Sequence, residues 1–392
     1  MKHAPVRLLS AVALLVAVTS SVAELSTEAK AAIRGEIKAV IDEGHYPGIS
    51  ILLIHNDTVV MREAQGVANF ETKRPFTVDE LCWLASTGKL FTGALMARLV
   101  DEGAISFDDP IAKTFPEFSG IRLRDGSTPR RPVLLRHALS HTSGIPSDRW
   151  LESEFKIKKD NPGHADYFRP KAPQDFINGC LKVGLVAEPG AKMIYGRPID
   201  LCASVVEART GKSFIELMEA RVFRPLGLAN TTIRPTKSDL KRLAPLYQSK
   251  EPGVYEADTF GLEVAERQNH RLSTAGGGVY STLDDIGTLM ELHLHHGRHN
   301  GRQLIKPETL RALYEPQPGT GGRYGLAMQI QRSTVNGEST LYTHPGYSGP
   351  VAWFDFERKL AGVLLMQSNT VGRSKHHKRI IDQIHKFIPA GK

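Results

Sequence analysis

The chain contains 392 residues with a formal net charge of +8 at neutral pH, and 41% of its residues are hydrophobic. This length is enough for a large core and about two domains. The charge excess is small and no nucleic-acid recognition motif accompanies it, which argues against a nucleic-acid partner. Three cysteines, Cys82, Cys180 and Cys202, are too few for a disulfide scaffold. Their apolar surroundings predict buried thiols, with a single bridge as the alternative.

The first 23 residues have the three-part layout of a secretory signal peptide. A basic start with Lys2 and Arg7 precedes the apolar run 8–18, and the small residues at 21–23 offer a cleavage site. The apolar run is short, since a membrane-spanning helix needs about 20 residues. We therefore expect export to the periplasm or the medium, and a mature chain that starts near Glu24 without a transmembrane span. A retained anchor is the alternative.

Both ends of the remaining chain carry strand patterns. Residues 26–43 have helical apolar spacing, and residues 48–66 contain two β-branched runs joined at Asn56 and Asp57, which predicts a β-hairpin. Four more strands are predicted near the C-terminus, at residues 324–331, 339–344, 351–357 and 360–368. A closing helix is predicted over residues 374–387.

The middle of the chain, from about residue 75 to 320, is rich in helical patterns interrupted by polar loops. Strands at both ends with helices between them predict an α/β (α+β) fold. We expect a discontinuous antiparallel β-sheet domain flanked by helices (24–75 and 320–392), and an inserted helical domain (76–319) that contains Ser86. Functional clefts often form where two such domains meet.

The glycine run at 276–278 raises the question of a phosphate-binding loop. No Lys-Ser or Lys-Thr pair follows it, so this interpretation is rejected. The run instead predicts a turn into a helix capped by Ser281 or Thr282, with Asp284 or Asp285 near the helix N-terminus.

A lysine occurs in the otherwise apolar helical pattern of residues 82–100. Leu90, Ala94 and Leu95 recur at helical spacing, while Ser86 and Lys89 share a face of the first turn. Burial of an ammonium costs several kcal/mol unless it is paired or deprotonated. Backbone N–H groups at a helix start favour a negative oxygen near Ser86, which makes Lys89 a candidate to accept or relay the serine proton.

The Ser-x-x-Lys spacing occurs three times, so by itself it has little weight. Ser153 with Lys156, and Ser238 with Lys241, lie in charged stretches that predict solvated surface. Only the pair at residues 86 and 89 begins an apolar helix. The alternative for that pair is a helix-capping serine followed by a lysine that reaches solvent.

Six segments of the chain match known motifs in the same order. They are STGK (86–89), LLRHALSHTSGIP (134–146), EPGAKMIYG (188–196), the segment 208–233, AGGGVYSTLDDI (275–286) and THPGYSG (343–349). Together they resemble the serine β-lactamase-related family, which includes penicillin-binding proteins, and especially its class C β-lactamase, D-aminopeptidase and esterase branch. The resemblance implies a β-lactamase/transpeptidase-like fold.

The resemblance also implies a role for each matching residue. Ser86 is implied as the nucleophile, Lys89 as its general base or proton relay, and Tyr195 as a second proton-transfer group. The backbone N–H groups of Ser86 and Tyr347 are implied as the oxyanion hole, which stabilises the charge that develops during acyl transfer. Gly346 lies on the segment that lines the substrate site.

Two positions depart from the family pattern. The motif Tyr-x-Asn is absent, and Arg197 stands where the asparagine is expected. If Arg197 points inward, its charge could hold a substrate carboxylate; if outward, it is a surface residue. His344 replaces the lysine of Lys-Thr-Gly, as in the esterase and some peptidase members, and is a candidate substrate contact. The alternative is a strand-end histidine bonded to backbone.

We therefore predict an exported serine hydrolase that acts through a Ser86 acyl-enzyme on a small ester, an amide or a peptidoglycan-like peptide. Because of the two departures, an esterase or D-amino-acid peptidase is favoured over a true β-lactamase. The alternative is a catalytically weak penicillin-binding, peptidoglycan-binding or sensor protein. No metal or other cofactor is predicted: the histidine-rich stretches 293–299 and 373–379 lack a zinc-hydrolase pattern and predict solvated helix ends.

Overall fold

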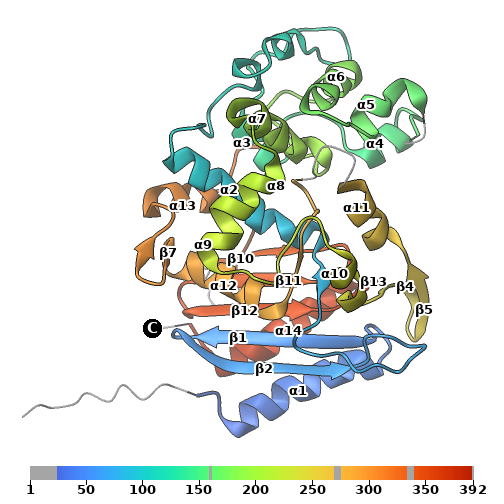
Figure 1. Cartoon of the computed structure of the whole chain (residues 1–392), viewed down its shortest axis with the longest axis vertical. Helices are drawn as coiled ribbons and strands as arrows, with labels where there is room; N and C mark the ends of the chain where they lie inside the picture. Colours follow the sequence, from blue (N-terminus) through green and yellow to red (C-terminus); the bar gives the residue numbers. More distant parts are fainter. Residues whose placement is uncertain (1–23, 159–160, 269–274, 333–339, 391–392) are drawn as a thin grey trace, which may run out of the picture.

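The structure, a computed structural model, describes residues 24–158, 161–268, 275–332 and 340–390, so the predicted signal peptide lies outside it. Its centre is a six-stranded antiparallel sheet with the order β2-β1-β12-β11-β10-β9 (Figure 1). Two strands come from the start of the chain and four from its end: β1 (Gly48–His55), β2 (Thr58–Gly66), β9 (Gln329–Arg332), β10 (Thr340–Pro345), β11 (Val351–Asp355) and β12 (Leu360–Leu365). The predicted fold class is confirmed.

The N-terminal hairpin forms as predicted and shows how the sheet is buried. Its turn lies at Asn56 and Asp57, which both have a positive φ. Successive side chains of a strand point to opposite faces. Leu53 accordingly packs into the core beneath α1 and α14, whereas Leu52 and Ile54 pack into the larger core on the other face. The sheet is therefore a layer between two helical layers.

The C-terminal strands are confirmed to within a few residues, except for the start of β9. The pattern predicts a strand from residue 324, but β9 begins at Gln329. The preceding residues turn instead: Ala327 has a φ of +64°, and a Cβ on Gly325 would lie 2.1 Å from the carbonyl oxygen of Leu313. The backbone at Gly325 thus packs directly against the end of α13, which prevents a regular strand.

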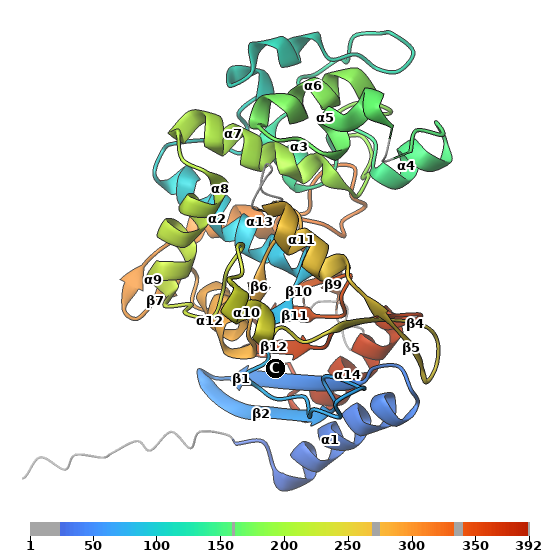
Figure 2. The same ribbon diagram turned by 45° about the vertical axis from the view of Figure 1, so that its right-hand side comes forward.

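Helices cover both faces of the sheet. α1 (Thr27–Asp42) and α14 (Arg373–Phe387) pack together on one face, and α12 (Leu283–Leu294) packs against β1, β11 and β12 on the other. Figures 1 and 2 show α3 to α7 farthest from the sheet. The remaining helices are α2 (Lys89–Asp101), α3 (Leu135–Leu139), α4 (Asp148–Ser153), α5 (Ala165–Phe168), α6 (Pro173–Val183), α7 (Asp200–Thr210), α8 (Phe214–Met218), α9 (Arg224–Leu226), α10 (Lys237–Arg242), α11 (Phe260–Gln268) and α13 (Pro307–Tyr314). The predicted domain boundaries stay a prediction.

The helix after the glycine run, α12, is where the sequence predicts it. Thr282 is its N-cap residue, although the Thr282 side chain makes no capping hydrogen bond. Asp284 and Asp285 both lie in its first turn, where a negative charge faces the positive end of the helix dipole.

A second, three-stranded sheet lies within the segment for which the sequence predicts helices. β4 (Leu246–Glu251) and β5 (Val254–Asp258) form a hairpin around Pro252 and Gly253, and β13 (Ser368–Thr370) pairs with β4 in parallel. The hairpin is short and partly exposed, so its apolar alternation is weak. It connects the middle of the chain to the residues just before α14.

The two histidine-rich stretches are less solvated than predicted. His376 and His377 in α14 are buried, as is His293 at the end of α12, which stacks on Phe354 with ring centres 4.6 Å apart. At the surface, His296 is exposed and His295 pairs with Asp57. The prediction of solvated helix ends is wrong for the three buried histidines, because the amphipathic faces of both helices continue to their ends.

The remaining composition-based expectations concern thiols, metals and membranes. Cys82, Cys180 and Cys202 are buried free thiols, so the predicted burial is confirmed and the single-bridge alternative is wrong. Within the described ranges, no group of three or more His, Cys, Asp or Glu side chains is placed to hold a metal ion. No helix in those ranges is long and apolar enough to cross a bilayer.

Acid is expected to unfold the protein through its buried histidines. Burial lowers the pKa of His293, His344 and His377 to about 3, and that of His137 and His385 to about 4. The unfolded chain therefore binds more protons than the folded one below about pH 6.5. The free energy of unfolding should be steady above that pH and fall as pH drops from about 6.5 toward 4, which urea unfolding at a series of pH values measures.

A pair of variants assigns part of this pH dependence to one residue. His293→Leu should make the decline between pH 6.5 and 4 shallower, by up to about 1.4 kcal/mol per pH unit. His296→Asn, three residues further on and exposed, serves as the control and should leave the decline unchanged. A free energy of unfolding that does not change from pH 7 to 5 would contradict the prediction.

Candidate active site

Ser86 lies in a 3₁₀ turn, Ala85–Gly88, that leads directly into α2. The sequence predicts one helix over residues 82–100, but the first residues form the short strand β3 (Cys82–Trp83), which pairs with β6 (Tyr280–Ser281). Ala85 has a φ of +46°, so the chain turns sharply between strand and helix. α2 is buried on nearly all sides rather than along one face.

Two side chains converge on the hydroxyl of Ser86. The Nζ atom of Lys89 lies 2.9 Å from Ser86 Oγ, and the hydroxyl of Tyr195 lies 2.8 Å from the same oxygen. Lys89 is only 3% exposed, whereas Tyr195 is 42% exposed. The Lys89 Nζ atom lies 5.0 Å from the centre of the Tyr195 ring. The alternative in which Lys89 reaches solvent is therefore wrong, and residues distant in the chain meet as predicted.

The glycine run holds the buried amine in place. Lys89 Nζ donates a hydrogen bond to the carbonyl oxygen of Gly276, 2.5 Å away, and the Gly276 amide donates to the carboxylate of Asp200. Thr92, one turn along α2, donates to the carbonyl oxygen of Ala275. A Cβ on Gly276 would lie 3.6 Å from Lys89 Nζ. The backbone carbonyl therefore supplies the hydrogen-bond acceptor that a buried amine requires, a partner that the sequence did not reveal.

The loop after β10 packs against the turn that carries Ser86. Thr87 donates a hydrogen bond to the carbonyl oxygen of Pro350, 3.1 Å away. A Cβ on Gly346 would lie 2.3 Å from the carbonyl oxygen of Leu84, so this approach requires glycine. Among the described residues, the amide of Tyr347 has no hydrogen-bond partner. This amide and the first N–H groups of the Ser86 turn are thus available to a substrate oxygen.

His344 lies at the end of β10 beside Tyr195, but both of its ring nitrogens are engaged. Nδ1 lies 3.0 Å from the carbonyl oxygen of Pro345, which can only accept, so Nδ1 carries the proton. Nε2 then accepts from the hydroxyl of Tyr324, 2.9 Å away. Burial, together with nearby Lys89, lowers the pKa of His344 to about 3. His344 is therefore neutral at physiological pH and supplies no positive charge to a substrate.

Arg197 neither points into the substrate site nor lies free on the surface, which were the two alternatives for this residue. Its Nη1 atom donates to the carbonyl oxygen of Phe168, 2.6 Å away, and Nη2 lies 3.5 Å from the carboxylate of Asp200. The guanidinium also lies over the ring of Phe176. These contacts hold Arg197 in the helical part of the molecule, and it does not line the pocket described below. The prediction of a substrate contact is not supported for this residue.

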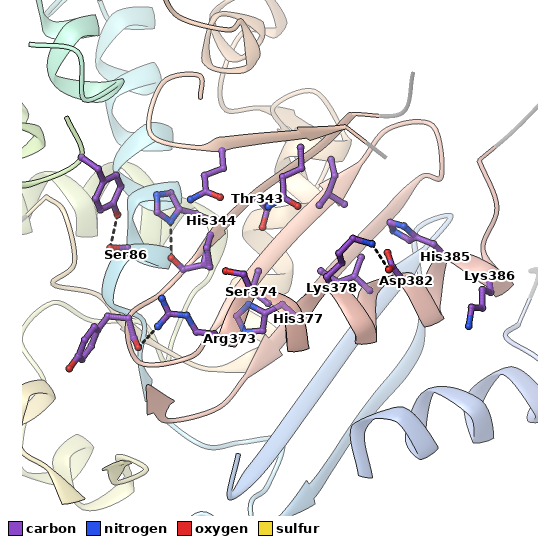
Figure 3. Close-up of a pocket in the computed structure, with 18 of the residues that line it drawn as sticks. Ser86, Thr343, His344, Arg373, Ser374, His377, Lys378, Asp382, His385 and Lys386 are labelled. Atoms are coloured by element: carbon purple, nitrogen blue, oxygen red, sulfur yellow. Dashed lines mark hydrogen bonds and ion pairs between the residues drawn. The ribbon is translucent and has the colours of Figure 1, made fainter. Parts of the chain in front are cut away.

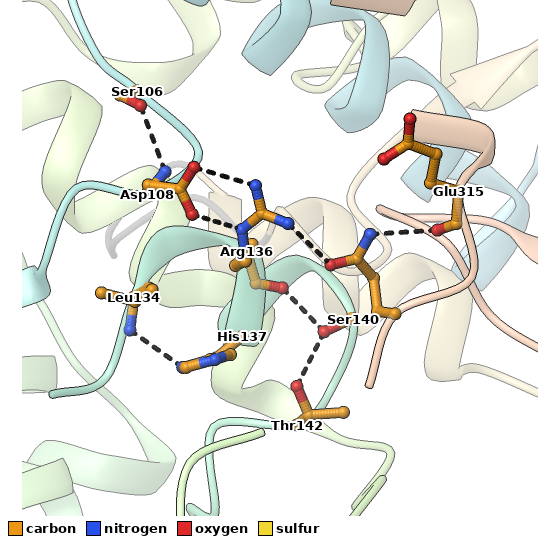
Figure 4. Close-up of polar contacts among 9 residues, drawn as sticks. Ser106, Asp108, Leu134, Arg136, His137, Ser140, Thr142 and Glu315 are labelled. Atoms are coloured by element: carbon orange, nitrogen blue, oxygen red, sulfur yellow. Dashed lines mark hydrogen bonds and ion pairs between the residues drawn. The ribbon is translucent and has the colours of Figure 1, made fainter. Parts of the chain in front are cut away.

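The segment 134–146 is held rigidly beside Tyr195. Figure 4 shows Arg136 in contact with Asp108, and the hydroxyl of Ser140 between the carbonyl oxygen of Arg136 and the hydroxyl of Thr142. The network fixes the backbone just before His141, which has a φ of +58°. Non-glycine residues held at positive φ are often found at functional sites.

His141 is a candidate positioning residue that the sequence analysis did not assign. It is fully buried, and its ring centre lies 4.2 Å from that of Tyr195. Its carbonyl oxygen accepts from the amide of Ile194, and its Nδ1 atom lies 3.4 Å from the amide of Gly196. Burial, with Lys89 and His344 nearby, lowers its pKa well below the usual value. A neutral imidazole therefore packs against the phenol and holds the residues on either side of it.

We expect His141→Asn to lower kcat about tenfold with little change in KM. Asparagine tolerates the left-handed backbone conformation, so the chain path is kept while the ring that packs against Tyr195 is lost. Steady-state kinetics and the melting temperature measure the effect. A rise in KM with kcat unchanged would contradict a positioning role.

The side chains of Ser86, Tyr195 and His344 open into a pocket of about 1020 Å³. Figure 3 shows Ser86 at one end of this pocket and Lys386, in the last turn of α14, at the other. Arg373, at the start of α14, lines the pocket and donates a hydrogen bond to the carbonyl oxygen of Tyr347. The sequence pattern predicts that Arg373 lies in a solvated helix start, but Arg373 is half-buried and lines the same pocket as Ser86.

Comparison with known proteins agrees with this geometry. A family model described as Beta-lactamase matches residues 33–386. The chain belongs to the β-lactamase family. Within this family it is a serine hydrolase, as the sequence predicts, since relatives that are 25% to 27% identical to it are named as an esterase and a carboxypeptidase.

The relatives include proteins with different substrates. Esterase EstB of Burkholderia gladioli is 27% identical over 67% of this chain and 70% of its own length. The D-alanyl-D-alanine-carboxypeptidase/endopeptidase AmpH of Escherichia coli (strain K12) is 25% identical over 63% of this chain and 57% of its own length. The solved structure of EstCE1, a hydrolase with promiscuous acyltransferase activity, superimposes with a TM-score of 0.76 over 91% of this chain and 98% of that one, at 22% identity. This last likeness shows the shared fold.

Proposed function

We propose that this serine hydrolase acts on esters or amides through an acyl-enzyme on Ser86, with esterase or D-amino-acid peptidase activity rather than efficient β-lactamase activity. The observation that carries the proposal is the pair of contacts to one oxygen. Ser86 Oγ lies within hydrogen-bond distance of both Lys89 Nζ and the Tyr195 hydroxyl, on the wall of a large pocket. A nucleophile with adjacent proton acceptors is the arrangement that covalent catalysis requires.

The burial of the two partners suggests how the proton moves. Ser86 Oγ attacks the substrate carbonyl carbon, and its proton passes to Lys89 or Tyr195. The carbonyl oxygen becomes negative and is stabilised by the N–H groups of Ser86 and Tyr347. Tyr195 is exposed to the pocket and can return the proton to the leaving group, whereas Lys89 is buried behind Ser86. The leaving group departs, the Ser86 ester remains, and water then hydrolyses it.

The preference against β-lactams rests on charge at the end of β10. His344 stands where the Lys-Thr-Gly members have lysine, and it is neutral and bonded to Tyr324. An ammonium that could attract a β-lactam carboxylate is thus missing from this position. Arg197 stands at the place of the family asparagine and is bound to Phe168 and Asp200 instead.

Labelling with two active-site probes tests the proposal. The purified protein is treated with a fluorophosphonate and, separately, with a fluorescent penicillin, and the modified residue is identified by mass spectrometry. We expect a fluorophosphonate adduct on Ser86, and hydrolysis of a nitrophenyl ester that exceeds hydrolysis of nitrocefin. Adducts on other residues, or no labelling by either probe, would overturn the acyl-enzyme proposal. Rapid nitrocefin turnover would overturn the preference for esters.

We also propose that the protein is exported. The support is the three-part layout of residues 1–23, with its basic start, apolar run and small residues. Expression of the full chain in a bacterial host should yield a processed protein outside the cytoplasm whose N-terminus is near Glu24. An unprocessed N-terminus in the cytoplasmic fraction would contradict export.

A further inference from the structure

The pocket at Ser86 continues along α14 as a groove far longer than a small acyl group requires. The groove, here called the α14 groove, runs between side chains of β9 and β10 and the side of α14 from Arg373 to Lys386 (Figure 3). A helix rises about 1.5 Å per residue, so these 13 steps correspond to about 20 Å. Its near end is the catalytic pocket itself, because Ser86 and Tyr195 line the same space.

The middle of the α14 groove carries no net charge. Lys378 and Asp382 form an ion pair with each other, 2.5 Å between Nζ and Oδ2. Burial keeps His377 neutral, with a pKa of about 3, and His385 also, with a pKa of about 4. Between these groups three aliphatic side chains, Ile381 on the helix and Leu341 and Val351 on the strands, contribute to the lining, and each is at most 9% exposed.

Two polar side chains in the same stretch, Thr343 and His377, are engaged within the protein, and the more exposed Gln329, Gln331 and Ser374 also line the groove. Thr343 donates its hydroxyl to the carbonyl oxygen of Ala352, 2.8 Å away. His377 lies 3.5 Å from the hydroxyl of Tyr46 and also contacts the backbone of Gly349. A peptide would bring an amide group every 3.3 Å or so that needs a partner. An aliphatic chain makes no such demand and gains about 0.8 kcal/mol for each buried methylene.

We propose that the α14 groove binds a long aliphatic chain attached to the scissile ester or amide, so that the preferred substrates are esters or amides of medium-chain to long-chain acids or alcohols. The inference rests on the proposed function, because it assigns a substrate class to the same serine. The chain extends from Ser86 past Ser374 and lies against Ile381. The aliphatic chain gains binding free energy in the groove only when the substrate is long enough to pass the first turn of α14.

Two chain-length series test the proposal. One contains nitrophenyl esters of acids with two to ten carbons, and the other contains acetate esters of alcohols of the same lengths. We expect kcat/KM of the wild-type protein to rise at least tenfold from the shortest to the longest member of one series, which also identifies the side of the ester that occupies the groove. A flat profile in both series, or a gain seen only with peptide substrates, would overturn the proposal.

A matched pair of variants locates the effect. Ser374→Phe places a ring in the groove at an exposed position, and Lys375→Phe places the same ring one residue further on, outside the groove. Ser374→Phe should reduce the ratio of kcat/KM for the longest and shortest esters to about one, whereas Lys375→Phe should preserve it. Equal ratios in both variants would overturn the assignment. If no ester is hydrolysed and Ser86 is not labelled, the proposed function itself fails; if short esters are hydrolysed without a length effect, only the groove assignment fails.

Discussion

Ser86→Ala is expected to lower kcat/KM for an ester substrate at least about 10³-fold and to abolish labelling by a fluorophosphonate. The variant keeps Lys89 and Tyr195 but removes the oxygen that both of them contact. Without it no acyl-enzyme can form, and only the N–H groups around the pocket remain to stabilise a reacting carbonyl. Initial rates and the intact mass of the treated protein measure the two effects.

The chain contains a natural control for this experiment. Ser153 and Lys156 repeat the Ser-x-x-Lys spacing at the end of α4, but there Nζ donates to the backbone oxygen of the serine rather than to its hydroxyl. Ser153→Ala should therefore leave turnover within about twofold of wild type. Wild-type turnover in Ser86→Ala, or a comparable loss in Ser153→Ala, would show that the wrong serine has been assigned.

Local patterns in the sequence predicted much of this arrangement. Ser86 and Lys89 are three residues apart, so their contact follows from one helical turn, and the hairpin of β1 and β2 follows from alternation and a turn pair. The part of the site that the sequence did not reveal comes from long-range contacts. The carbonyl that binds Lys89 belongs to Gly276, 187 residues away, and the ring that packs on Tyr195 belongs to His141. Neither contact leaves a periodic signal.

Buried polar residues caused the errors in the histidine-rich stretches. In α14 the residue types of segment 373–379 predict a solvated, basic surface. His376 and His377 are nevertheless buried, and Arg373 is half-buried against the loop that contains Tyr347. Histidine is uncharged when buried, so it can belong to the apolar face of a helix while it counts as polar in a sequence pattern. Residues of α14, including Arg373 and His377, line the pocket that runs along this helix.

Separate substitutions of Tyr195 and Lys89 are expected to give different dependences on the leaving group. Tyr195→Phe should lower kcat/KM about 10²-fold to 10⁴-fold for an alkyl ester, and distinctly less for a nitrophenyl ester. An alkoxide needs a proton in order to depart, whereas a nitrophenolate does not. The exposed phenol, 42% accessible on the pocket wall, is the partner that can supply this proton.

Lys89→Met is expected to lower kcat/KM for both esters by a similar factor of at least about 10². Lys89 is 3% exposed and contacts Ser86 Oγ from the protein interior. Its amine therefore assists formation of the nucleophile but cannot reach the departing group. The ratio of the two substrates therefore separates the roles independently of any general loss of activity, and melting curves identify a variant that fails to fold. If Lys89→Met showed the stronger dependence on the leaving group, the proposal that Tyr195 donates the proton to the leaving group would be wrong.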